Sequence, residues 1–106
     1  MPTYNKLIRD RIPAMIAMTG KEANTTTLSD KDYVEELKKK TKEELQEYLA
    51  ADNDQDALEE LADMLELIHA LTKVHGSTVE ELEVIREKKA EQRGGFNERV
   101  FLIDVE

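Results

Sequence analysis

Residues 56–75 read DALEELADMLELIHALTKVH, and this stretch decides the fold. Its large apolar residues recur at helical spacing and cover an arc too wide for a helix that is half in water. We therefore expect a central helix with neighbours on several sides, ending before Gly76. The apolar residues are Leu58, Leu61, Met64, Leu65, Leu67, Ile68, Leu71 and Val74.

A second long helix is predicted over residues 30–50. Ser29 and Asp32 have the spacing of a capping box, in which a side-chain oxygen accepts a hydrogen bond from a free backbone N–H group. The polar linker 51–56 is short enough to make this helix and the central helix antiparallel neighbours.

Two shorter helices are expected beside this pair. One is capped by Asp10 and ends at Gly20, a residue that suits the turn after a helix. The other covers residues 79–92 and follows a second capping box, formed by Thr78 and Glu81.

The C-terminal run 99–105 is apolar and rich in residues that favour strands. We predict an extended strand or a docked tail there, with residues 4–8 as the suggested pairing partner. The predicted fold class is all-α: an antiparallel helical bundle in one domain over residues 1–106, with this strand pair as an addition.

The chain is strongly acidic, with 24 Asp and Glu against 15 Lys and Arg, for a net charge of −9. This balance argues against binding to nucleic acid polymers. The absence of cysteine excludes disulfides, thiol nucleophiles and cysteine-ligated zinc. No apolar run approaches the roughly 18 residues of a membrane span, and no signal-peptide region is seen, so we expect a cytoplasmic protein without membrane contact.

Each long helix carries a pair of acids where apolar residues are expected. At about 100° per residue, Glu44 falls inside the apolar arc of its helix and Glu47 falls on the edge of that arc. On the central helix, Glu60 lies inside the arc and Asp63 lies just beyond it. Lys40 is the best basic partner at these borders.

Carboxylates that converge between two helices repel one another and need cations. Hard divalent cations suit an all-oxygen site, and Mg²⁺ commonly bridges to substrate phosphates. Such ions would activate a water molecule and stabilise charge at a phosphorus centre. The plainer alternative is that these acids belong to solvated helix faces.

The order of the acids resembles that of a known family. Residues 43–47, EELQE, followed by residues 60–63, ELAD, are similar to the signature of the MazG-like all-α nucleoside triphosphate pyrophosphatases. That superfamily includes dimeric dUTPases and phosphoribosyl-ATP pyrophosphohydrolase. The flanking stretches 6–13, KLIRDRIP, and 93–96, RGGF, resemble a small stand-alone branch of predicted house-cleaning pyrophosphatases.

The resemblance implies hydrolysis of a nucleotide between its α- and β-phosphates, with release of a monophosphate and pyrophosphate. It makes Glu44, Glu47, Glu60 and Asp63 the catalytic ligands of Mg²⁺, or of Mn²⁺ in its place. A water on the metal would be the nucleophile, and one of the four acids could serve as its base. A homo-oligomer is also expected, and a dimer would cover the apolar central helix.

A triphosphate also needs cationic partners. Lys6 and Arg9 precede the first helix, and Arg86, Lys89 and Arg93 follow one face of the last helix. These five residues are the candidate phosphate contacts, with Arg93 first because the adjoining glycine pair allows close approach of the backbone to a ligand. Ion pairs with surface acids are the alternative role.

Two other functions compete with the hydrolase. A di-iron carboxylate bundle would use two Glu-x-x-His pairs, but Glu66 and His69 form a single pair that faces away from Glu60. The chain could instead be a helical dimerisation or adaptor module whose acids keep it in solution. Specific Mg²⁺ uptake distinguishes the hydrolase from the adaptor.

Overall fold

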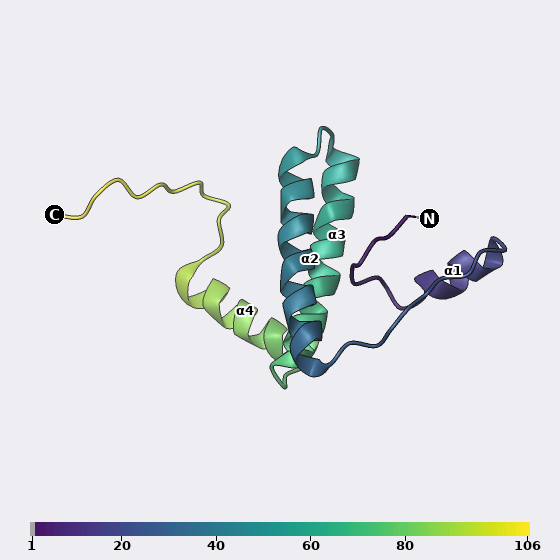
Figure 1. Cartoon of the computed structure of the whole chain (residues 1–106). Coiled ribbons are helices and arrows are strands. Elements are labelled where there is room, and N and C mark those ends of the chain that lie inside the picture. Colours follow the sequence, from purple (N-terminus) through teal and green to yellow (C-terminus); the bar gives the residue numbers. More distant parts are fainter. Residues whose placement is uncertain (1) are drawn as a thin grey trace.

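An antiparallel hairpin of two helices, α2 (Asp30–Ala50) and α3 (Asp54–Val74), forms the centre of the computed structural model, which describes residues 2–106. The short α1 (Ile12–Met18) precedes it, and α4 (Val79–Arg93) leaves the base of α3 at an angle (Figure 1). α2 and α3 pack along their length, whereas α4 touches only α3 and α1 packs on none of the other helices in the described range. The predicted all-α class is confirmed.

Local capping determines where the two long helices begin. The Ser29 hydroxyl accepts a hydrogen bond from the Asp32 N–H at 3.2 Å, and α2 has the predicted bounds. α3 begins two residues earlier than predicted, because the Asn53 side chain accepts a hydrogen bond from the Asp56 N–H at 2.8 Å. Asparagine is a strong N-cap residue, so the sequence already indicated this start of α3, and the prediction missed it.

The two shorter helices follow their predicted positions with one correction. The Thr78 hydroxyl accepts a hydrogen bond from the Glu81 N–H at 3.1 Å, and α4 extends one residue beyond its predicted end. The predicted cap of α1 is wrong: Arg11, not Asp10, occupies the N-cap, and no side chain bonds there. Pro13 in the first turn lacks a backbone N–H group, which reduces the need for a cap.

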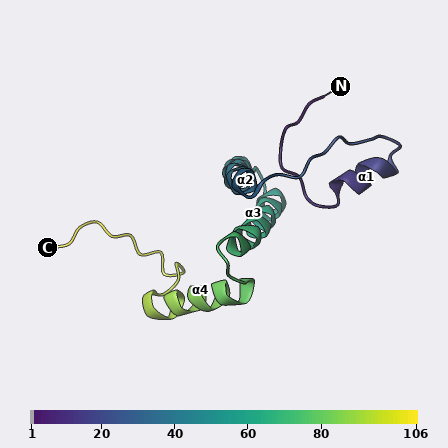
Figure 2. The ribbon, with the colours of Figure 1, turned by 60° about the horizontal axis from the view of Figure 1, so that its bottom comes forward.

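The predicted strand pair is absent from residues 2–106. Residues 99–105 run as an extended segment on the opposite side of the hairpin from the N-terminal segment (Figures 1 and 2). α4 directs this tail away from the hairpin, so its apolar side chains remain exposed; Phe101, for example, is 87% exposed.

The hydrophobic core lies between α2 and α3 and is small. Leu37, which is 2% exposed, and Leu67, which is 8% exposed, are the buried apolar side chains of the described residues. The opposite side of α3 exposes an apolar stripe of Leu58, Leu61, Leu65 and Ile68. α3 packs on α2 and, less extensively, on α4, as expected of the central helix, but α1 and α4 leave this stripe uncovered.

Among residues 2–106, none of the helices combines the length and apolar character required to cross a bilayer.

Candidate metal centre

Three of the four predicted acids converge between the long helices. Glu44 and Glu47 lie on one face of α2, because residues three apart are neighbours on the surface of a helix. Glu60 reaches the same place from α3. One carboxylate oxygen from each residue lies within 4.8 Å of the others. No histidine joins this group within residues 2–106, so the Glu66–His69 pair of the di-iron alternative lies outside it.

Two oxygens of this cluster have no hydrogen-bond partner. Oε2 of Glu44 and Oε2 of Glu60 are both buried, and no donor reaches either atom. A buried carboxylate oxygen without a donor costs free energy, and the cost is greater when the group is ionised. A cation or a proton at this position would remove the cost, so the donor set fits a divalent metal ion.

Burial raises the pKa of Glu44 to about 8, and the neighbouring carboxyl groups of Glu60, Glu47 and Asp63 act in the same direction. Without a cation, the cluster therefore retains a proton on Glu44 at neutral pH. A divalent cation would favour the ionised carboxylate and displace this proton.

The fourth predicted acid is held by a basic residue. Nη2 of Arg9 donates a hydrogen bond to Oδ1 of Asp63 at 2.6 Å, so the N-terminal segment is joined to α3. Both side chains are partly exposed, and a pair of this kind contributes at most about 1 kcal/mol. Asp63 remains close enough for its charge to act on Glu44.

The predicted phosphate contacts lie in two separate places. Lys6 lies beside α2, with its ammonium nitrogen 5.5 Å from the ring centre of Tyr4. Arg86, Lys89 and Arg93 lie on α4, which diverges from the hairpin (Figure 1). The structure therefore brings Lys6 and Arg9 to the hairpin, but it does not bring the α4 residues to the carboxylates of the same chain.

Arg86 is engaged within its own helix. It forms an ion pair with Glu83 and lies 4.0 Å from a carboxylate oxygen of Glu87. This is the surface pairing that the sequence left open as its alternative role. Lys89 and Arg93 are exposed and form no ion pair within residues 2–106.

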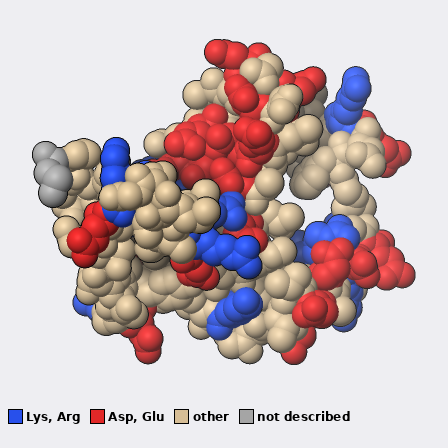
Figure 3. Space-filling view, turned by 90° about the vertical axis from the view of Figure 1, so that its right-hand side faces the viewer, with Lys and Arg blue, Asp and Glu red and all other residues tan. Residues whose placement is uncertain are grey.

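Sequence reasoning named Lys6 as a phosphate contact and Lys40 as the basic partner of the acids, but it missed Lys39 and the grouping of the three. Lys39 and Lys40 of α2 line a shallow pocket together with Lys6. Lys40 precedes Glu44 by four residues, a spacing that places both on one face of α2 and could have indicated the group. In the space-filling view of Figure 3, the acidic side chains form a patch and basic side chains adjoin it.

Comparisons of the chain with protein-family models, curated proteins and solved structures find no match.

Proposed function

We propose that the protein is a Mg²⁺-dependent nucleoside triphosphate pyrophosphohydrolase. It would cleave between the α- and β-phosphates and release a nucleoside monophosphate and pyrophosphate. The observation that carries this proposal is the convergence of Glu44, Glu47 and Glu60, with two buried oxygens that lack donors. The resemblance of residues 43–47 and 60–63 to the MazG-like signature supports the reaction class. A cytoplasmic location fits the absence of cysteine.

The ligand set proposed for Mg²⁺ consists entirely of carboxylates. Glu44, Glu47 and Glu60 would hold the ion, and Asp63 would join them when it separates from Arg9. Mn²⁺ accepts the same oxygen ligands. When bound, the ion would neutralise charge on the phosphates and lower the pKa of a water molecule.

Arg9 has a proposed role that depends on the same pair. Once Asp63 turns to the metal, the Arg9 guanidinium is free to bind a phosphate of the substrate. Its planar set of donors suits two oxygens of one phosphate. The exposed Arg9–Asp63 pair is weak enough to open for this exchange.

We also propose that the protein is a homodimer in which a second copy covers the stripe of Leu58, Leu61, Leu65 and Ile68. These residues alternate at spacings of three and four, the spacing of a seam between paired helices. Two hairpins that meet through such seams form a four-helix bundle.

The surface area of the chain supports a dimer. The accessible surface is 9924 Å², whereas a compact monomer of 12.2 kDa has about 6,100 Å². The radius of gyration is 18.2 Å, against about 13 Å for a compact chain of this length. This excess includes the exposed apolar stripe of α3, together with α1, α4 and the extended tail, which pack little on the hairpin.

A pyrophosphate-release screen over canonical and damaged nucleoside triphosphates, with Mg²⁺ present, tests the hydrolase. Glu60→Gln should lower the rate by at least about 100-fold, because it removes a charged metal ligand. Glu59→Gln is the matched control: it makes the same change at the adjacent, exposed position and should leave the rate near that of the wild type. Equal losses in both variants, or no release from any nucleotide, would contradict the proposal.

The exposed apolar stripe also suits the second candidate, a dimerisation or adaptor module. An adaptor would bind no metal specifically. A thermal-shift titration with Mg²⁺ separates the candidates, since the hydrolase should gain stability with a saturating dependence that Glu60→Gln abolishes.

A further inference from the structure

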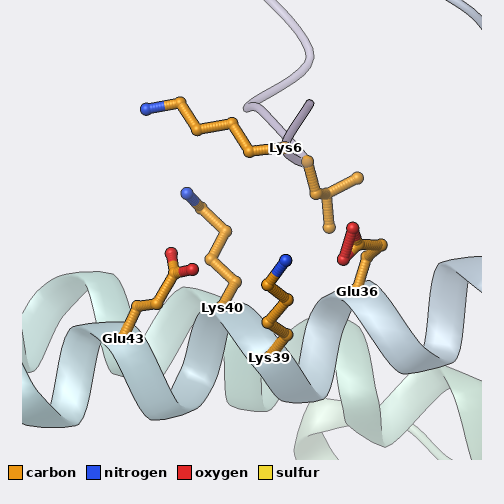
Figure 4. A pocket seen from close by; sticks show the side chains of 6 residues that line it. Lys6, Glu36, Lys39, Lys40 and Glu43 are labelled. Atoms are coloured by element: carbon orange, nitrogen blue, oxygen red, sulfur yellow. The ribbon is translucent and has the colours of Figure 1, made fainter. Parts of the chain in front are cut away.

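The N-terminal segment and α2 together form a lysine pocket, which we define by Lys6, Lys39 and Lys40. Leu7, Glu36 and Glu43 complete its lining. Figure 4 shows Lys39 and Lys40 pointing from α2 toward the N-terminal segment, the Lys6 side chain running above them, and the carboxylates of Glu36 and Glu43 beside them.

The three lysines of the pocket form no ion pair within residues 2–106. Within the described range, the ion pairs join Arg9 to Asp63 and Arg86 to two acids of α4, and none of them includes a residue of the pocket. This holds although the chain has a net charge of −9 and two glutamates line the same pocket. Three lysines against two glutamates leave a formal charge of +1 at the pocket, which favours an anion over a cation there.

Two segments of the chain, α2 and the N-terminal segment, each carry residues of both the lysine pocket and the candidate metal centre. On α2, Lys40 precedes Glu44 by about one helical turn, so the two side chains share a face. Along the N-terminal segment, Arg9 follows Lys6 by three residues and contacts Asp63. A ligand that extends from the carboxylates along α2 would therefore meet the lysines next.

We propose that the lysine pocket binds the β- and γ-phosphates of the nucleotide, which leave together as pyrophosphate. This inference rests on the proposed hydrolase function and assigns the leaving-group end of the same site. The carboxylates would hold the metal at the bond that breaks, while Lys6, Lys39 and Lys40 offset the negative charge that grows on the departing pyrophosphate. Ammonium groups act here as mobile point charges, which suits a group that must be released.

Isothermal titration with inorganic pyrophosphate, in EDTA and at low ionic strength, tests the pocket without metal or chemistry. The Lys39→Gln/Lys40→Gln double variant should bind pyrophosphate at least about tenfold more weakly than the wild type, since two charge-assisted contacts are lost. Lys38→Gln/Lys42→Gln is the matched control, because it removes the same charge from the same helix at positions that do not line the pocket. Lys6→Gln, outside the helices, should also weaken binding.

The outcomes separate this inference from the hydrolase proposal. Binding that Glu60→Gln retains, together with failure to hydrolyse any nucleotide, would support the pocket and contradict the hydrolase. Hydrolysis with no pyrophosphate binding in EDTA, or with equal losses in the two double variants, would overturn the pocket and leave the hydrolase intact. Circular dichroism melting confirms that each variant is folded, and Lys6→Gln provides a test that does not alter a helix.

Discussion

The two sides of α3 each depart in one respect from those of an ordinary surface helix. The side that packs on α2 holds Glu60 in a cluster of carboxylates, two of whose oxygens are buried without donors. The other side exposes Leu58, Leu61, Leu65 and Ile68 to water. A charged side chain thus lies beside the apolar core, and four large apolar side chains lie in water. Both departures cost stability in a single chain, and they support the proposals of a cation on one side and a partner on the other.

The largest expected effect tests the small core between the two long helices. Leu37→Ala should lower the free energy of unfolding by about 2–5 kcal/mol, because it opens a cavity in a region with few other buried side chains. Leu102→Ala, in the exposed tail, should change it by less than about 0.5 kcal/mol. Urea unfolding at a fixed protein concentration measures both. Similar losses would show that the tail is packed in solution.

The exposed side of α3 can be tested by placing a charge on it. Leu65→Glu should weaken self-association at least about 100-fold, since it would bury an unpaired carboxylate at the proposed seam. Met18→Glu makes a comparable change on α1, which packs on no other helix, and should leave association unchanged. Light scattering at micromolar concentration gives the oligomeric state. A wild-type monomer would contradict the dimer.

The carboxylates between α2 and α3 predict an unusual pH dependence. The pKa of Glu44 is raised from 4.5 to about 8 in the folded chain, so its contribution to metal-free stability is complete below pH 4.5 and is lost as the pH rises through about 8. In EDTA, the wild type should therefore lose stability relative to Glu44→Gln as the pH rises over this range. Glu43→Gln, which leaves Glu44 in place, should follow the wild type.

The same proton links Mg²⁺ affinity to pH. The ion needs the ionised carboxylate, so affinity should rise with pH up to about 8, by about tenfold per unit if one proton is displaced. Calorimetric titration with Mg²⁺ in buffers of different ionisation enthalpy counts the protons released. An affinity that does not change with pH would place the metal away from Glu44.

The smallest expected effect concerns the turn that joins the two long helices. Asn53→Ala should cost about 1 kcal/mol, because the Asp56 N–H would lose its acceptor at the start of α3. Asp52→Ala, one residue earlier and outside both helices, should cost less than about 0.5 kcal/mol. Thermal melting followed by circular dichroism measures the difference.

The helices and the acid pairs could be predicted from the sequence because their causes are local. The capping bonds of Ser29 and Thr78 span three residues, and the spacing of Glu44 and Glu47 determines that they share a face. The same reasoning failed for Asp10, since a cap needs both a suitable side chain and a backbone geometry that places it at the N-cap.

Tertiary structure alone decided which side chains from different segments meet. The sequence put Asp63 with the metal ligands and Arg9 with the phosphate contacts, whereas the path of the N-terminal segment pairs them at 2.6 Å. That path also creates the lysine pocket, and the angle of α4 separates Arg93 from the carboxylates. Helical periodicity fixes the direction of a side chain about its own axis, but contacts between segments depend on how those axes and loops are placed in space.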